Sequence, residues 1–429
     1  MAADPVSFIL SLAALIILLG FIGEEIFKRT HVPSFLFLVF AGFIMGPVFG
    51  LINESLLAPV LSIFAELTLI MVLFHGGIDL KLNTVLKEGW RVFLQVFLYI
   101  SVSAVFIVIV SFFVLHLNII LSLILASIIG GETTAVVVIP LSRELKIRDS
   151  SVAFLTFESA LNSIVLVILF LTFVSIYQGS VGTAGLAGTG LGFSELYTTA
   201  TSVTSSFSIG IVIGLVLSVL WVYLLNYLKG RNYTYVLTLG LLFLTFSLTN
   251  YAGGSGFLAV IIFGTILGNH TFISGLLKKK VRMGNLEKQL FHLQGEITFM
   301  LKTFFFVFLG LIISLSFSNL IFGLSIGVAF LIVLLASRYM AVSISTFKSD
   351  MKNDKKAMVI SLAQGLTPAT LATLAVSYNI AHAGTFLVIT TYVIILTNVV
   401  TTVGSFMILR KNKKSGVGTS AKQIKPKNK

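Results

Sequence analysis

Two stretches interrupt the long apolar runs of this sequence: Gly130-Gly131-Glu132-Thr133-Thr134 and Gln364-Gly365-Leu366-Thr367-Pro368-Ala369-Thr370. Glycine and proline weaken helical hydrogen bonding, and threonine side chains can satisfy the backbone groups that a break sets free. Unwound carbonyl groups and half-helix ends at such breaks can coordinate a cation near the middle of a membrane. The alternative is that these glycine and threonine residues only allow close packing of helices.

The composition is typical of a helical membrane protein. Of the 429 residues, 57% are hydrophobic and only 10% are charged, whereas soluble domains contain roughly 25% charged residues. A β-barrel would have short alternating segments instead of long unbroken apolar runs. Cysteine is absent, which excludes disulfides and thiolate metal sites. We therefore expect an all-α polytopic membrane protein. The sequence also predicts no cofactor and no metal site, apart from a site for an alkali cation at the breaks.

The apolar runs predict thirteen transmembrane spans, at approximately 6–27, 33–52, 57–79, 90–115, 118–141, 151–176, 204–228, 233–252, 254–270, 296–316, 318–346, 355–377 and 383–410. Spans one to six and spans eight to thirteen start on opposite sides of the membrane. This pattern predicts two inverted six-helix repeats, about 6–176 and 233–410, with a linker helix at about 204–228. The two interrupted stretches lie in the fifth span of each repeat. The transmembrane domain would then cover residues 1–410, followed by a basic tail at 411–429.

Cationic residues are confined to alternate connections between the spans. With the N-terminus outside, the inner segments contain 27 of the 29 Lys and Arg residues, and the outer loops contain none. This distribution predicts an external N-terminus and a cytoplasmic C-terminus. The net charge of +13 is then explained by topology and by contact of the tail with anionic lipid, not by nucleic-acid binding. We expect a multi-pass protein of a prokaryotic plasma membrane.

Four ionisable side chains lie inside the apolar spans, namely Glu132, Glu158, Lys302 and Arg338. Each costs about 2.5–3.5 kcal/mol at the bilayer centre, so such residues are usually functional. A buried Arg near a buried Glu should pair with it, since an unpaired ion would be costly. We therefore predict a structural ion pair between Glu158 and Arg338. Lys302 either extends toward a membrane interface or has a gating or charge-balancing role beside Glu132.

Polar residues elsewhere support this arrangement. In span six, Glu158 and Asn162 are four residues apart and share a helix face with Ser163. The charged residues at the end of span one are expected to form a solvated cluster at the interface: Glu24, Glu25, Lys28 and Arg29.

The order of several motifs, each weak alone, resembles the sodium/proton exchanger superfamily of monovalent cation:proton antiporters. These motifs are Leu19-Gly20 with Val32-Pro33, Gly42-Phe43-Ile44-Met45-Gly46-Pro47, Leu73-Phe74-His75-Gly76-Gly77-Ile78-Asp79-Leu80, Gly256-Phe257-Leu258-Ala259-Val260, and Phe304-Phe305-Phe306-Val307-Phe308-Leu309-Gly310. The resemblance covers all thirteen spans. It implies a six-helix bundle, with two crossed broken helices, that moves against a dimerisation scaffold in a homodimer.

The sequence departs from this family at an important position. In the family, span six usually contains an Asp that binds the cation and the proton alternately, but here Ser163 occupies that position, although Asn162 matches the pattern. Glu132 aligns with the Asp of the span-five motif. Gln364 aligns with an Arg found in span twelve of many relatives, and Arg338 matches the Arg that pairs with the span-six Glu.

These comparisons of residues lead to the hypothesis that Glu132 is the exchanging carboxylate. A hard alkali cation takes several oxygen ligands, and the expected ligands besides Glu132 and backbone carbonyls are Thr133, Thr134, Asn162, Ser163 and Thr367. Gln364 is a further candidate for gating or charge balance. The predicted function is exchange of Na⁺ or Li⁺, with K⁺ as an alternative, for H⁺ by alternating access.

Two other functions stay open from the sequence. A cation channel would conduct ions without proton coupling, although the sequence contains no selectivity-filter repeat. A transport-inactive or sensor homologue would account for Ser163 at the position of the usual Asp. An enzyme is not predicted, because the sequence contains no nucleophile–base set and no metal-ligand spacing.

Overall fold

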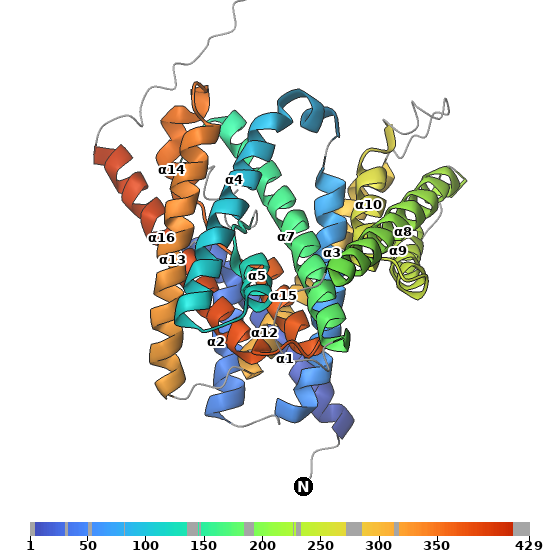
Figure 1. Cartoon of the computed structure of the whole chain (residues 1–429), viewed down its shortest axis with the longest axis horizontal. Coiled ribbons are helices and arrows are strands. Elements are labelled where there is room, and N and C mark those ends of the chain that lie inside the picture. The colour runs from blue at the N-terminus through green and yellow to red at the C-terminus, as the bar shows by residue number, and fades with distance from the viewer. Residues whose placement is uncertain are drawn as a thin grey trace, which may run out of the picture.

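The structure is a computed structural model that describes residues 5–30, 33–49, 54–80, 82–134, 145, 147–183, 193–225, 227–228, 233–271, 285–312 and 317–414. Within these ranges all regular elements are helical (Figure 1). They are α1 (Pro5–Thr30), α2 (Ser34–Phe43) with a π-helical continuation η1 (Ile44–Val48), α3 (Glu54–Asp79), α4 (Leu82–Val114), α5 (Ile119–Ile129), α7 (Asp149–Thr183), α8 (Phe193–Leu225), α9 (Thr234–Tyr251), α10 (Gly256–Gly268), α12 (Asn285–Ile312), α13 (Phe317–Ser345), η2 (Asp350–Asp354), α14 (Lys355–Ile360), α15 (Leu366–Ser377) and α16 (Ala383–Lys414).

The all-helical architecture is confirmed in the described part of the chain. Nine of its helices are long and apolar enough to cross a membrane, and four shorter apolar helices accompany them, at places where the sequence also predicts spans. The shorter elements are Ser34–Gly46, Ile119–Ile129, Gly256–Gly268 and Leu366–Ser377. Two of these four short helices, α5 and α15, are the ones that the glycine-rich stretches interrupt.

Several boundaries differ from the predicted ones. The sequence predicts a linker helix at about 204–228, but α8 already begins at Phe193. Hydropathy marks the part of a helix that lies in lipid, whereas helix propagation continues through polar residues at little cost. Only the first part of the predicted span 118–141 is described, because residues 135–144 lie outside the described ranges. Of the predicted basic tail, residues 411–414 end α16, and 415–429 are likewise outside the described part.

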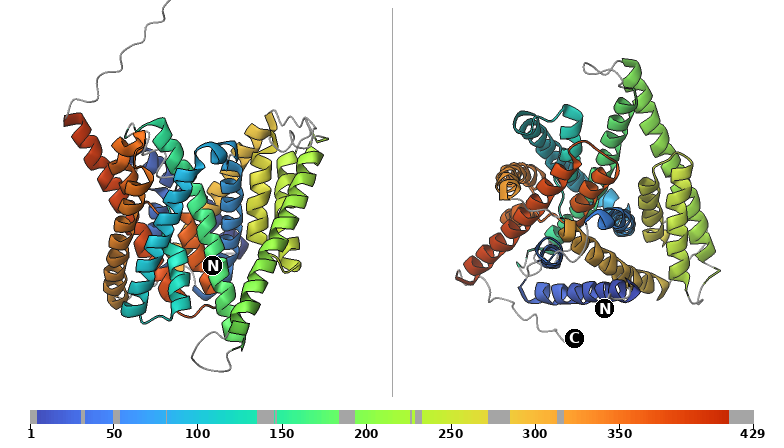
Figure 2. Two further views of the ribbon diagram at one scale, coloured as in Figure 1. Left: turned by 45° about the horizontal axis from the view of Figure 1, so that its top comes forward. Right: turned by 90° about the horizontal axis from the view of Figure 1, so that it is seen from below.

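The helices form two groups (Figures 1 and 2). The first group, which we call the broken-helix bundle, consists of α4, α5, α7, α13, α14, α15 and α16. The second, which we call the scaffold, consists of α1, α2, α3, α8, α9, α10 and α12. In the scaffold α10 packs against α3 and α8, and α12 packs against α1, α2 and α3. The two groups meet where α3 packs against α15 and α7.

The short helix α5 lies in the interior of the broken-helix bundle. Ile124, Leu125, Ile128 and Ile129 are fully buried, as expected for a helix that is apolar on all sides. The helix begins at Asn118, whose side chain accepts a hydrogen bond from the Leu121 N–H at 2.8 Å, a standard N-cap. Burial of α5 places its C-terminal end, and therefore the first break, deep in the protein.

Glycine residues bring the scaffold backbones into direct contact. A Cβ atom on Gly42 of α2 would overlap the carbonyl oxygen of Val307 in α12, and one on Gly310 of α12 would overlap the carbonyl oxygen of Val39. Gly264 of α10 lies in the same way against the carbonyl of Phe74 in α3. Such contacts between small residues are a main source of helix association in membranes. The scaffold is therefore tightly joined along these two helix pairs.

Replacing Gly42 with Ala is expected to destabilise the protein by about 1–3 kcal/mol, the usual cost of overpacking. The added methyl group would meet a backbone atom that cannot rotate away. The matched control is Gly240→Ala in α9, where a Cβ atom would meet nothing within 4 Å and where Ala favours the helix by up to about 1 kcal/mol. Thermal unfolding in detergent compares the two variants. An unchanged unfolding temperature for Gly42→Ala would contradict the close contact.

Candidate ion-binding site

The first break puts a carboxyl group in the middle of the protein. Helix α5 ends at Ile129, with Gly130 as its C-cap, and Gly131 follows with a φ of +94°, a conformation that residues with a side chain rarely adopt. The backbone then continues without helical structure through Glu132, Thr133 and Thr134. Glu132 and Thr133 are 2% and 1% exposed. The change of backbone direction at Gly131 thus places the Glu132 side chain away from the bulk solvent.

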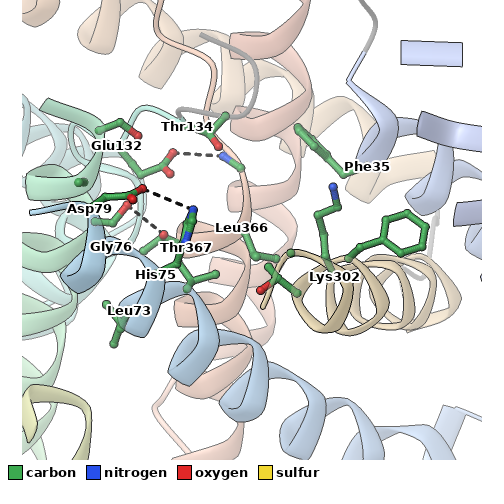
Figure 3. Close-up of a pocket in the computed structure, with 18 of the residues that line it drawn as sticks. Phe35, Leu73, His75, Gly76, Asp79, Glu132, Thr134, Lys302, Leu366 and Thr367 are labelled. Atoms are coloured by element: carbon green, nitrogen blue, oxygen red, sulfur yellow. Dashed lines mark hydrogen bonds and ion pairs between the residues drawn. The ribbon is translucent and has the colours of Figure 1, made fainter. Parts of the chain in front are cut away.

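The second break crosses the first directly. Helix α14 ends at Ile360 and α15 begins at Leu366, with residues 361–365 between them not helical. The Thr134 N–H donates to the carbonyl of Ala363 at 2.8 Å. The Gly365 N–H donates to Glu132 Oε2 at 3.1 Å, which is one of the dashed lines in Figure 3. Because Gly365 is the N-cap of α15, the carboxyl group lies at the positive end of a half-helix, where a negative charge is favoured.

Helix α7 holds this crossing in place through its polar face. Ser159 Oγ donates to the Thr133 carbonyl at 2.5 Å, and Asn162 Nδ2 donates to Thr133 Oγ1 at 3.3 Å. Thr367 Oγ1 donates to Ser163 Oγ at 3.2 Å. The structure therefore brings together all six residues that the sequence predicts for ion binding. Asn162 Oδ1 is buried without a hydrogen-bond partner in the described residues.

A cavity of about 730 Å³ reaches the crossing. Its wall on the side of the broken-helix bundle is formed by Glu132, Thr134, Thr156, Ser159, Ser163, Gly365 and Thr367. The opposite wall is formed by the scaffold and includes Glu24, Ser34, His75, Asp79, Gln294 and Lys302. Figure 3 shows Glu132 and Thr134 on one side of this view and Lys302 on the other. Thr133 and Asn162 are not part of the wall and lie behind the crossing, where they position its backbone.

Glu158 and Arg338 form a pair that is entirely buried. Arg338 Nη1 lies 2.8 Å from Glu158 Oε1, and Nη2 lies 3.3 Å from Oε2, with both side chains 0% exposed. Gln95 Nε2 also donates to Glu158 Oε1 at 3.1 Å, and Arg338 Nε donates to the Met358 carbonyl at 2.9 Å. The guanidinium group lies over the ring of Tyr99, 5.1 Å from its centre. These contacts compensate for the removal of both charges from water.

Gln364 lies behind the crossing. Its Nε2 donates to the Ile129 carbonyl, at the C-terminal end of α5, at 2.7 Å. Asn398 Nδ2 of α16 donates to the Gln364 carbonyl at 2.6 Å. A neutral amide thus satisfies an end carbonyl of the broken helix, whose partial charge is negative. Gln364 is fully buried and is not part of the cavity wall.

Lys302 does not lie beside Glu132 as an ion-pair partner. Its Nζ lies 2.7 Å from Glu24 Oε1, and no ion pair joins it to Glu132 in the described part of the chain. The reason is the close packing of α1 on α12 at Gly20, where a Cβ atom would lie only 2.6 Å from the Thr303 side chain. Glu24, one helical turn after Gly20, is thereby brought against Lys302.

This contact also corrects the predicted cluster at the end of span one. Glu25 forms the expected exposed pair with Arg29 at 3.4 Å, but Glu24 turns into the cavity. The side chain of Lys28 lies outside the described part of the structure.

Some residues of the site were not predicted. Gln95, with Ser345 bonded to its Oε1 at 2.8 Å, and Asn398 are polar residues within apolar spans, a signal that marks functional positions in membranes. That signal was present in the sequence. The hydrogen bond from the Gly365 N–H to Glu132 could not be predicted from the sequence, because every residue except proline has a backbone N–H donor.

Comparisons with known proteins agree with the overall fold. The protein-family model described as "Sodium/hydrogen exchanger, transmembrane" matches residues 12–411. The Na(+)/H(+) antiporter NhaG of Bacillus atrophaeus is 26% identical over 248 residues, which are 57% of this chain and 46% of that relative. The alignment therefore spans less than half of the relative's length. The solved structure of the sodium proton antiporter MjNhaP1 from Methanocaldococcus jannaschii at pH 8 is similar with a TM-score of 0.76 and 18% identity, covering 95% of this chain and 99% of that one.

Proposed function

Because this chain belongs to the sodium/hydrogen exchanger family, we propose that it exchanges Na⁺ for H⁺ across a membrane by alternating access. The observation that carries the proposal is the position of Glu132. Its carboxyl group is 2% exposed, lies at the crossing of two broken helices and faces the cavity. It has no ion-pair partner among the residues that the structure describes. One carboxylate in such a place can hold a proton or a cation, but not both at once.

The cation would be held by oxygen atoms on both sides of the crossing. Glu132, Thr134, Ser163 and Thr367 all line the cavity, and hard alkali cations take carboxylate, hydroxyl and carbonyl oxygens. Thr133 and Asn162 would act by fixing the backbone of the first break. Li⁺ and K⁺ prefer the same kind of ligand as Na⁺, so they are included as candidate substrates and are separated by experiment below.

Alternating access is supported by a difference along the interface between the two groups of helices. One end of this interface is open as the cavity, and the other end is closed by a side-chain contact. The cavity extends along α3 near His75 and Asp79. Near the other end of α3, Ser377 Oγ of α15 donates to Ser62 Oγ at 2.7 Å. Movement of the broken-helix bundle against the glycine-joined scaffold would separate Ser62 from Ser377 and close the present cavity.

We further propose the topology that the charge distribution predicts, with the N-terminus outside, the cavity open to the cytoplasm and the basic segment 411–429 inside. The repeats would be about 6–176 and 233–410, with the linker helix about 204–228 between them. The family resemblance supports a homodimer in a prokaryotic plasma membrane. Because the alignment to the curated relative covers 46% of it, the substrate and the assembly are proposals for this chain.

The orientation can be measured with single cysteines, because the chain contains no cysteine of its own. Gly295 lines the cavity and has open space where a Cβ atom would be, so Gly295→Cys should react with a membrane-impermeant maleimide only after permeabilisation of cells. Tyr251, at the opposite end of α9 from the inner connections, is 90% exposed. Tyr251→Cys should react in intact cells. The reverse pattern would invert the proposed topology.

Transport itself is tested in proteoliposomes that contain a pH-sensitive dye. A proton gradient is imposed, and Na⁺, Li⁺ or K⁺ is then added to vesicles with and without protein. Exchange predicts that Na⁺ collapses the gradient only when protein is present, and the response to each ion gives the selectivity. Cation uptake without proton movement would favour a channel. No response to any cation, from protein shown to be folded, would favour a transport-inactive homologue.

A further inference from the structure

A second ion pair lies in the wall of the cavity that faces Glu132. Lys302 Nζ and Glu24 Oε1 are 2.7 Å apart, with side chains only 14% and 29% exposed. Ser34 Oγ donates to the same Glu24 oxygen at 3.0 Å. Lys302, Glu24 and Glu132 all line this one cavity. A lysine ammonium therefore lies inside the space through which, on the proposed function, an alkali cation reaches the crossing.

The ammonium group shares this cavity with three carboxylates, Glu24, Asp79 and Glu132. Attraction between unlike charges grows as water is excluded, and a lysine ammonium sits on a flexible stem and can rotate toward a new partner. The wall contains one further carboxylate, Asp79, whose side chain is 40% exposed and lies 3.4 Å from His75 on α3, a contact that is an ion pair only when the histidine is protonated. After loss of the contact with Glu24, the two other carboxylates of the wall are Asp79 and Glu132. Glu132 is the buried one, at 2% exposed, so water screens its attraction for the ammonium group least.

We propose that Glu24 is a positioning residue for transport, which holds the Lys302 ammonium on the scaffold wall and so keeps it from occupying the cation position at Glu132. The inference rests on the proposed function, in which Glu132 binds the transported cation. A lysine ammonium and an alkali cation carry the same charge and would compete for the same carboxylate. The Glu24–Lys302 pair thus keeps the acid available without removing the lysine from the cavity.

The test is Glu24→Gln, which preserves size but removes the negative charge, so only a weaker neutral hydrogen bond to the ammonium group is left. Sodium would then have to displace Lys302 from Glu132, so the KM for Na⁺ should rise by about tenfold or more, in line with the coupling of close charge pairs. The maximal rate at saturating Na⁺ should change little, because the competitor is displaced at high concentration. A folding defect would instead lower the maximal rate. The double variant Glu24→Gln/Lys302→Gln removes the competitor, and its KM should return toward the wild-type value.

The chain offers a matched control next to this residue. Glu25 pairs with Arg29 on the exposed face of α1, so Glu25→Gln should have the wild-type KM. A second variant, Glu24→Gln/Lys302→Arg, keeps a cation in place and should keep the raised KM.

Each arm of the experiment answers a different question. A wild-type KM in Glu24→Gln, or a KM that stays raised in the double Gln variant, would overturn the role of Glu24. Absence of Na⁺-dependent proton movement in the wild type would overturn the proposed function together with this inference. Normal exchange in Glu132→Gln would leave exchange in place but overturn the role of Glu132, and this inference with it. The Glu24 variants therefore test the role of Glu24, and the wild-type and Glu132→Gln measurements test the proposed function independently.

Discussion

Glu132→Gln is expected to reduce Na⁺-dependent proton movement to the level of vesicles without protein. Glutamine has nearly the same size as glutamate, and its side-chain oxygen can still accept the hydrogen bond that Gly365 donates at 3.1 Å. The crossing should therefore keep its structure. What the variant loses is the negative charge that neutralises a cation and the site that takes up a proton. The dye assay in proteoliposomes measures the loss, and an unchanged unfolding temperature verifies the fold.

Ser163→Ala is the informative companion to this variant. Ser163 contributes one hydroxyl oxygen among several and accepts one hydrogen bond from Thr367 at 3.2 Å. We expect exchange to survive with a raised KM for Na⁺. Complete loss in Ser163→Ala combined with normal exchange in Glu132→Gln would place the exchanging group on α7 and refute the assignment to Glu132.

Arg338→Ala is expected to have the largest effect on stability. It leaves the Glu158 carboxylate, which is 0% exposed, without its partner, and breaking a buried pair in this way costs about 3–5 kcal/mol. We expect a strong decrease in the yield of monodisperse protein and in the unfolding temperature. Size-exclusion chromatography and thermal unfolding in detergent measure these two quantities.

Two further variants show whether this loss comes from the uncompensated charge. Arg29→Ala removes one partner of an exposed pair, whose usual contribution is below about 1 kcal/mol, so its unfolding temperature should be close to wild type. Glu158→Leu/Arg338→Met removes both buried charges and should recover much of the stability that Arg338→Ala loses. A double variant as unstable as the single one would mean that packing of the long Arg338 side chain dominates.

The general fold could be predicted because its main determinants are local in the sequence. Apolar runs mark the spans, and each break carries its own glycine signal, such as Gly131 with a φ of +94°. Helix ends were less predictable. Helix α8 starts at Phe193, well before its apolar part, because backbone hydrogen bonding continues where hydropathy ends.

In the site, the contact that could be predicted is the ion pair between Glu158 and Arg338. Glu158 and Arg338 are deep in apolar spans, so each requires the other. Lys302 lies in the same cavity as Glu24 and Glu132. Which of these two carboxylates it pairs with depends on how closely α1 packs on α12. That packing follows from Gly20 against Thr303, a contact between segments far apart in the chain. Hydropathy and helix periodicity contain no information about it.

The buried pair of Glu158 and Arg338 has a consequence for the energy source of transport. The two charges cancel inside the broken-helix bundle. If Glu132 binds one proton or one sodium ion, as proposed, the loaded bundle would be electrically neutral at the depth of the crossing. The membrane voltage would then do no work on the cycle in either direction. The sodium gradient at which net movement stops would be set by the pH difference alone, so a cell could run such a carrier even when its membrane is depolarised.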